Sequence, residues 1–314
     1  MAASPTPDHT TERRNGSLVP CGLGEFGLGD WKQIITLAIA LVGLVGNSII
    51  LWLLGFRIQR SPFSVYILNL AGADALFLCG LFGVYLKRFI GYFNDVTDQV
   101  VITFTFLFYH LGLSLLAAIS TERCLSVLFP IWYKCHRPKH ASAAVCAALW
   151  ALAGLFCVTY WVLCIYTCDS PHCLPFTITL FVWFILLTPV LCASSLILVL
   201  RVQCGSQRQQ PPRFYLLVLL TVLVFLLCGV PAGIVDFLYT FAGLDLRYHV
   251  FSLLLASVNS SANPFIYFFL GSQRRRGREP LRVVLQRALG DPQEFESRVR
   301  DTLHPNTTEV SSQG

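Results

Sequence analysis

Charged residues are scarce in this sequence. They make up 13% of the 314 residues, whereas hydrophobic residues make up 55%. A water-soluble domain carries about 25% charged residues. The composition therefore excludes an ordinary water-soluble protein and predicts that much of the apolar surface faces lipid.

The scarcity of charge leaves long apolar runs. Each holds at least about 20 residues, enough for a helix to cross the hydrocarbon core of a bilayer. Because lipid offers the backbone no hydrogen-bond partners, such runs form helices, whereas the strands of a membrane barrel would be shorter and would alternate in polarity. The runs lie at residues 34–56, 63–86, 100–121, 142–166, 174–200, 214–238 and 250–270. The sequence thus predicts an all-α membrane protein, a bundle of seven transmembrane helices.

The basic residues indicate which way the bundle faces. The net charge is +6, but the cations are sorted by topology rather than gathered into a surface for nucleic acid, so we expect no nucleic-acid partner. The cation-rich loops hold Arg57, Arg60, Lys134, Arg137, Lys139, Arg201, Arg208, Arg213 and Arg274 to Arg276. Loops rich in Lys and Arg stay in the cytoplasm. We therefore expect a multi-pass protein of the plasma membrane with an extracellular N-terminus.

Four segments follow from this topology. Residues 1–30 are expected to form an extracellular tail without a cleavable signal peptide, so the first helix would direct insertion. Asn15 begins a glycosylation sequon in that tail. Residues 31–272 would form the bundle, and residues 273–290 a short amphipathic helix 8 on cytoplasmic membrane lipids, with a soluble helix as the alternative. Residues 291–314 are polar and are expected to be disordered.

Polar residues inside the runs are candidates for function, because ionisable groups are costly in lipid. Asp74 lies in the second run, and the polar residues expected to face it form a polar core with it. That core comprises Asn47, Asp74, Asn259 and Asn263. Three prolines interrupt helical hydrogen bonding and are candidate hinges. They are Pro189, Pro231 and Pro264.

Two sequence motifs, each in its own apolar run, carry a resemblance to a known family. Glu122-Arg123-Cys124 ends the third run, and residues 263–267 (Asn-Pro-Phe-Ile-Tyr) lie in the seventh. Their arrangement resembles that of the rhodopsin-like, or class A, seven-transmembrane receptors. Longer stretches are similar to the Mas-related G-protein-coupled receptor family over roughly residues 30–290. Those stretches are 51–57, 120–128, 225–231 and 259–264.

The resemblance implies a receptor that binds an extracellular small molecule or short peptide. It also implies a heterotrimeric G protein as partner, with calcium raised through phospholipase C. Arg123 would contact the G protein, Glu122 would hold Arg123 at rest, and Tyr267 would swing inward on activation. After phosphorylation by a receptor kinase, the hydroxyl-rich tail would recruit arrestin. A sodium ion near Asp74 is one possibility and an ion-free hydrogen-bonded network is the other, since Gly112 replaces a frequent serine. No other cofactor is expected.

Departures from the wider class shape further expectations. No cysteine lies near the start of the third helix, and the Mas-related pattern implies a Cys164–Cys173 disulfide, with Cys168–Cys173 or free thiols as alternatives. Gly229 stands where most rhodopsin-like receptors have tryptophan, which would leave the pocket floor without its aromatic residue. No acidic residue lies near residues 211–213 that could form an ion pair with Arg123 from the sixth helix. We therefore expect some ligand-independent signalling.

A ligand pocket is expected between the outer ends of the third to seventh helices. Its candidate residues are Phe106, Tyr109, His110, Tyr160, Thr177, Asp236 and Tyr239. In some Mas-related receptors, acidic residues at the positions of Tyr160 and Thr177 bind cationic ligands. Neither Tyr160 nor Thr177 is acidic, so these binding groups are missing here. Asp236 is the one carboxylate placed to face the pocket. Packing, an interfacial aromatic belt or snorkelling to the headgroups are the alternatives for these side chains.

Other functional classes fit less well. A transporter or channel would show internal repeats or a line of ionisable residues, and the sequence has neither. An intramembrane enzyme would need a motif such as His-Glu-x-x-His or Gly-x-Ser-x-Gly in a span, and none is present, so we expect no enzymatic activity. A receptor-like protein that mainly signals constitutively or modulates partners stays open, because its motifs would look the same.

Overall fold

The computed structural model describes residues 31–57, 61–90, 95–138, 140–162, 173–204 and 212–272. Its regular elements in those ranges are all helices. They are α1 (Trp31–Trp52), the π-helix η1 (Leu53–Arg57), α2 (Pro62–Ile90), α3 (Asp95–Leu128), α4 (Pro130–Cys135), α5 (Ala141–Tyr160), α6 (Cys173–Cys204), α7 (Pro212–Val224), the π-helix η4 (Phe225–Gly229), α8 (Val230–Ala242) and α9 (Leu246–Ser272).

Seven of the described segments are long and apolar enough to span a membrane, which confirms the predicted bundle. The sixth span comprises α7, η4 and α8, and α4 is a short helix between the third and fourth spans. Apolar side chains such as Leu155 and Leu186 are more than 60% exposed, while the polar Asn47 is 1% exposed. Lipid in place of water explains this inverted pattern, because apolar groups can face outward at no cost.

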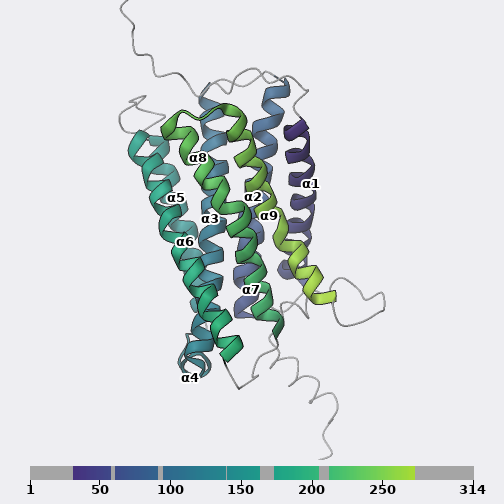
Figure 1. Cartoon of the computed structure of the whole chain (residues 1–314), viewed down its shortest axis with the longest axis vertical. Helices are drawn as coiled ribbons and strands as arrows, with labels where there is room; N and C mark the ends of the chain where they lie inside the picture. Colours follow the sequence, from purple (N-terminus) through teal and green to yellow (C-terminus); the bar gives the residue numbers. More distant parts are fainter. Residues whose placement is uncertain are drawn as a thin grey trace, which may run out of the picture. The chain divides into compact units, whose positions relative to one another are not determined.

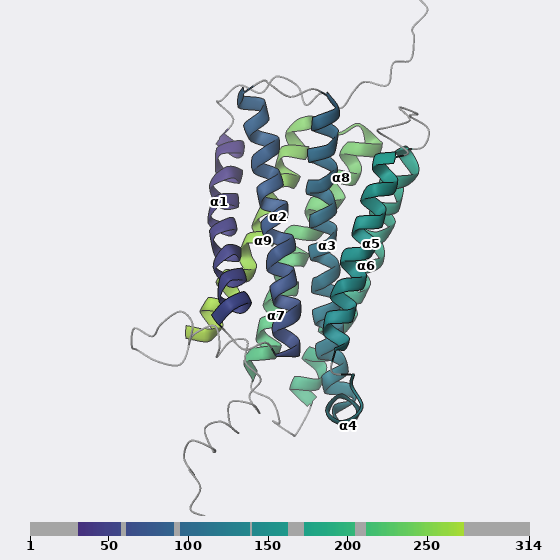
Figure 2. The same cartoon turned by 180° about the vertical axis from the view of Figure 1, so that it is seen from behind.

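Helix α3 forms the centre of the bundle. It contacts α2, α5, α6, α7 and α9, and Figures 1 and 2 show it surrounded by these helices from both sides. Helix α1 packs against α2 and α9, so the first and last spans lie side by side. Residues far apart in the sequence can therefore meet around α3.

Small residues allow α1 and α9 to approach closely. A Cβ atom added at Gly43 would lie 2.0 Å from Oγ of Ser261, and one added at Gly46 would lie 3.0 Å from Cβ of Pro264. The Ser261 hydroxyl donates a hydrogen bond to the carbonyl of Ile39 at 3.2 Å. The contact thus combines close backbone packing with a polar link, as is typical of helix pairs in membranes.

The sixth span contains a backbone feature that the hydrophobic pattern did not predict. The π-helix η4 ends at Gly229, two residues before Pro231. Proline has no amide hydrogen to donate to the preceding turn, so the wide turn lies next to the point where helical bonding is interrupted. Pro189 and Pro264 lie inside α6 and α9, respectively. Hinge motion at all three prolines stays a prediction.

The bundle has two ends that matter for function. We call them the α4 end, which carries α4 and the C-terminus of α3, and the pocket end, where α8 is followed by α9 (Figure 1). The predicted tails (1–30 and 291–314), helix 8 (273–290), Asn15 and Cys164 lie outside the described residues. Cys173 begins α6, but its side chain is not described, so the disulfide stays a prediction.

Candidate functional site

At the α4 end, a network of polar side chains surrounds Glu122 at the C-terminal part of α3. Nη2 of Arg137 lies 2.6 Å from Oε1 of Glu122, and the Tyr133 hydroxyl donates to the same oxygen at 2.8 Å. The Tyr66 hydroxyl of α2 donates to the other oxygen at 3.4 Å. The side chains of Glu122 and Arg137 are only 11% and 7% exposed. Glu122 therefore ties α4 and its following residues to α3 and α2.

Two further contacts fix this network. Arg137 also donates to the hydroxyl of Ser142 in the first turn of α5, and its guanidinium lies 5.1 Å from the centre of the Tyr133 ring. Burial raises the pKa of the Tyr133 phenol to about 12. The phenol thus stays protonated at physiological pH and keeps its proton available for donation to Glu122.

Arg123 lies beside this network. Its Cζ atom is 3.8 Å from the centre of the Phe63 ring on α2, which places the guanidinium over the aromatic face. Cations are attracted to such faces by the ring quadrupole. The partners that the structure gives to Glu122 are Arg137, Tyr133 and Tyr66, so the role expected for Glu122, that of holding Arg123 at rest, stays a prediction.

The predicted polar core lies in the middle of the bundle. Nδ2 of Asn263 donates to Oδ2 of Asp74 at 2.8 Å, and Ser260 is also hydrogen-bonded to this carboxylate. Nδ2 of Asn47 donates to the carbonyls of Gly43 at 3.0 Å and Ser260 at 3.2 Å. Asn259 is buried in the same region of α9. Helices α1 and α9 are thus joined by Asn47, and helices α2 and α9 by Asp74 and Asn263.

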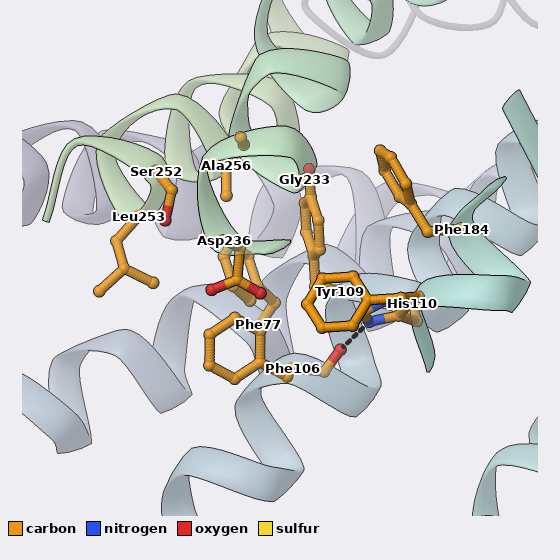
Figure 3. Close-up of a pocket in the computed structure, with 12 residues that line it drawn as sticks. Phe77, Phe106, Tyr109, His110, Phe184, Gly233, Asp236, Ser252, Leu253 and Ala256 are labelled. Atoms are coloured by element: carbon orange, nitrogen blue, oxygen red, sulfur yellow. Dashed lines mark hydrogen bonds between the residues drawn. The ribbon is translucent and has the colours of Figure 1, made fainter. Parts of the chain in front are cut away.

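The third feature is a cavity at the pocket end, shown in Figure 3. Its empty volume is about 400 Å³, including the mouth. Four of the seven predicted pocket residues line it, namely Phe106, Tyr109, His110 and Asp236. The other described lining residues are Phe77, Phe181, Phe184, Ala232, Gly233, Ser252, Leu253 and Ala256. Helices α2, α3, α6, α8 and α9 all contribute, so the cavity lies between helices as predicted.

Three predicted pocket residues are not among those that line this cavity. Tyr160 packs edge-on against Phe176, with ring centres 5.8 Å apart. The Tyr239 ring stacks against His249 with ring centres 4.5 Å apart. Thr177 lies on α6, one helical turn before the lining residue Phe181. Tyr239 therefore supports the site indirectly, through His249.

Two phenylalanines lie close to the glycines at the expected floor of the pocket. Gly229 does lack a side chain, but a Cβ atom added there would lie 2.5 Å from the Phe225 ring. At Gly233 an added Cβ atom would lie 2.4 Å from the ring of Phe184. The rings of Phe184 and Phe225 lie 6.1 Å apart. Phe225 and Phe184 therefore pack against Gly229 and Gly233, and Phe184 also lines the cavity, while the position of Gly229 itself has no aromatic side chain.

Comparisons with known proteins agree with the geometry. The family model described as "7 transmembrane receptor (rhodopsin family)" matches residues 46–267. Human (Homo sapiens) Mas-related G-protein coupled receptor member X1 is 48% identical over 272 residues, which cover 84% of each chain. Member X2 of Macaca mulatta is 49% identical over 302 residues, covering 92% of this chain and 91% of that protein. The chain belongs to the Mas-related G-protein-coupled receptor family.

Membership in this family places the three described sites in one receptor bundle. This Mas-related receptor is a multi-pass membrane protein, and the relatives are receptors rather than enzymes. G-protein coupling follows from the family. The order of residues along α3 relates the three sites: His110 lines the cavity, a Cβ atom added at Gly112 would lie 3.2 Å from Oδ1 of Asp74 in the polar core, and the Glu122–Arg123 motif follows near the C-terminus of the helix. The bundle therefore connects a possible ligand site to a possible G-protein site.

The polar core also bears on the sodium ion. Oδ1 of Asn47 and Oδ1 of Asn259 are buried without a hydrogen-bond partner among the described residues. With the Asp74 carboxylate they are oxygen ligands of the kind that hard cations take. Gly112 offers no hydroxyl, and a Cβ atom added there would lie 3.2 Å from Oδ1 of Asp74. Asp74, Asn47 and Asn259 would hold a sodium ion if one binds, and its presence stays a prediction.

Sequence reasoning missed several residues of this Mas-related receptor. Nε2 of His249 lies 3.5 Å from Oδ1 of Asp236, and the intramembrane carboxylate was itself a signal to search for such a partner. Arg137 as the partner of Glu122 had no sequence signal, because only the turn after Pro130 brings it back to α3. Phe77, Phe181 and Phe184 had none either, since aromatic residues are common throughout the spans.

Proposed function

We propose that this Mas-related receptor lies in the plasma membrane with its N-terminus outside and binds a small molecule or short peptide at the pocket end. Binding activates a heterotrimeric G protein at the α4 end and raises calcium through phospholipase C. The described basic residues support this orientation, because Arg137 follows α4, Arg57 ends η1 and Arg201 lies in the last turn of α6. A receptor kinase and arrestin would then act on the C-terminal tail, which lies outside the described residues.

One observation carries the proposal. The same helix, α3, lines the cavity with Phe106, Tyr109 and His110 and carries Glu122 and Arg123 at its other end. Thirteen residues separate His110 from Arg123, which is roughly 20 Å at about 1.5 Å per residue. A ligand that shifts α3 or its neighbours can thus bias the α4 end, since packed helices transmit displacement.

The proposal further explains why the polar core lies where it does. Asp74 on α2 is joined to Asn263 on α9, and Tyr267 lies one helical turn further along α9 with a side chain that is 2% exposed. A buried tyrosine that moves on activation must leave this packing. The polar core is therefore placed to set the balance between resting and active arrangements.

The test compares calcium release in cells that express the wild-type receptor, Arg123→Ala or Arg57→Ala. A panel of small amines, amino acids, steroids and short peptides supplies the ligands, and surface expression is matched. Arg57 is the control because it is exposed, basic and at the same end, but belongs to η1, apart from the Arg123 motif. We expect a ligand response in the wild type and in Arg57→Ala, and its loss in Arg123→Ala.

A response that survives in Arg123→Ala would overturn the role of Arg123 in coupling. Silence of the wild type across the panel, with no basal signal above mock-transfected cells, would favour the partner-modulating alternative. A basal signal in the wild type that Arg123→Ala removes would support both coupling and ligand-independent signalling.

A further inference from the structure

The cavity at the pocket end combines one carboxylate with aromatic walls. Among its described lining residues, Asp236 is the only acidic one and none is Lys or Arg. Figure 3 shows the Asp236 carboxylate facing the aromatic side chains of Phe77, Phe106 and Tyr109. Ring faces carry negative electrostatic potential, so both the walls and the carboxylate attract cations and repel anions.

Asp236 is held only loosely by the protein. Within the described part of the chain, its ion-pair partner is His249, and the 3.5 Å between Nε2 and Oδ1 exceeds the length of an ordinary charge-assisted hydrogen bond. The Asp236 side chain remains 21% exposed, on the cavity side. A carboxylate in a largely apolar site gains stability from a close cation. The geometry of the cavity therefore suits a cation beside the Asp236 carboxylate.

The histidines near the cavity are occupied elsewhere. The ring of His249 lies 4.5 Å from the Tyr239 ring and 6.3 Å from the Phe106 ring, and His249 is 7% exposed and is not among the described lining residues of the cavity. Nδ1 of His110 is hydrogen-bonded to the carbonyl of Phe106 at 2.8 Å, within its own helix.

We propose that the cavity binds a small organic cation, an alkyl- or arylalkylammonium group, with Asp236 accepting its N–H donors and Phe77, Phe106 and Tyr109 forming the walls. This inference rests on the proposed receptor function and gives the chemical class of the ligand. The ammonium nitrogen lies near the Asp236 carboxylate and the apolar part of the ligand points toward Phe184 on the floor.

The proposed site differs from that implied for some Mas-related receptors, in which acidic residues on the fourth and fifth spans bind cationic ligands. The corresponding positions are Tyr160 and Thr177, which carry no charge and do not line the cavity. Asp236 lies on α8 instead, so the cation would sit between the third, sixth and seventh spans.

The test measures binding directly, with the purified full-length receptor in lipid nanodiscs and thermal unfolding as the readout. The probes are phenethylamine, which is a cation at neutral pH, and 2-phenylethanol, which has the same ring and chain without the charge. The variants are Asp236→Asn and the control Asp245→Asn. Asp245 is an exposed carboxylate in the turn between α8 and α9 and is not a lining residue.

We expect phenethylamine to stabilise the wild type and Asp245→Asn at millimolar concentration and 2-phenylethanol to do so far less. Asp236→Asn should weaken phenethylamine binding about 10- to 100-fold, the range for loss of a charge-assisted hydrogen bond. No stabilisation of the wild type by phenethylamine, equal stabilisation by the alcohol, or unchanged binding in Asp236→Asn would each overturn the proposal.

A second variant keeps the test decisive if Asp236→Asn does not fold. Phe106→Leu keeps an apolar side chain of similar length but removes one aromatic wall, and we expect it to weaken phenethylamine binding about threefold or more. Unchanged binding in this variant would count against the aromatic walls.

These measurements need no G protein, so the two proposals can fail separately. Binding without a calcium response would overturn the signalling proposal alone. A calcium response to another ligand, unaffected in Asp236→Asn, would overturn the cation site alone.

Discussion

The two ends of the bundle each contain a carboxylate, but the protein holds them in different ways. At the α4 end, Glu122 has partners at 2.6, 2.8 and 3.4 Å. At the pocket end, Asp236 has His249 at 3.5 Å. Glu122 is also surrounded by groups from α2 and from α4 and the residues after it, whereas Asp236 faces a cavity.

This difference suggests a division of roles. A buried carboxylate with several short contacts stabilises one arrangement of the helices around it. A carboxylate with one long contact contributes little to the fold and is available to a ligand. The receptor would then keep its α4 end fixed by internal ion pairing, while the pocket end depends on the ligand for a close partner.

The largest expected effect comes from breaking the Glu122–Arg137 pair. Glu122→Gln leaves the guanidinium of Arg137, which is 7% exposed, without its carboxylate, and we expect a loss of about 3 kcal/mol in the free energy of unfolding. Denaturant titration of the purified receptor in mixed micelles measures this loss. We also expect basal signalling to rise, because α4 is released from α3.

The double variant Glu122→Gln/Arg137→Gln is the matching test. It removes both charges, so it should be less destabilised than the sum of the two single variants. Strict additivity would show that the pair is not coupled, and the contrast between the two ends would then disappear.

The next effect concerns the cavity floor. Gly233→Ala places a Cβ atom within 2.4 Å of the Phe184 ring, so the ring must move, at a cost of about 1–3 kcal/mol. The same titration should show this destabilisation, and a Phe184→Leu background should relieve it. Gly154→Ala is the control, since no atom lies within 4 Å of an added Cβ, and it should be neutral or stabilising. Equal behaviour of the two glycines would contradict the packing at the floor.

A smaller effect is expected from Tyr133→Phe. This change removes the 2.8 Å hydrogen bond to Glu122 but keeps the ring beneath Arg137, so it should cost about 1.5 kcal/mol. Tyr248→Phe, on a tyrosine that is 52% exposed, should change stability by less than about 0.5 kcal/mol. A neutral Tyr133→Phe would mean that Arg137 alone fixes Glu122.

The spans could be predicted from the sequence because hydropathy sets them directly. The run at 63–86 corresponds to the span Pro62–Leu86 and the run at 250–270 to Tyr248–Leu270. The sixth run predicted one helix with its hydrogen bonding interrupted at Pro231, and the structure has the π-helix η4 just before that residue. Composition does not specify whether a backbone carbonyl accepts its hydrogen bond from the amide four or five residues later, so the π-helix η4 could not be predicted.

The site was predictable only in part, for a similar reason. Phe106, Tyr109 and His110 were placed by their helix, and Asp236 by its spacing from Pro231, so these four converge as expected. Contacts that depend on a change of chain direction were not predictable. Arg137 reaches Glu122 only because α4 turns back after Pro130, and His249 reaches Asp236 only through the turn between α8 and α9.

The smallest expected effect belongs to the pocket end. His249→Gln removes the ion-pair partner of Asp236, and at 3.5 Å we expect a loss of under about 1 kcal/mol in the free energy of unfolding. Phenethylamine binding should persist in this variant, because the carboxylate and the aromatic walls remain. A loss as large as that in Glu122→Gln would mean that Asp236 serves the fold rather than the ligand. The two carboxylates would then be equivalent, and the case for a cation site would lose its basis.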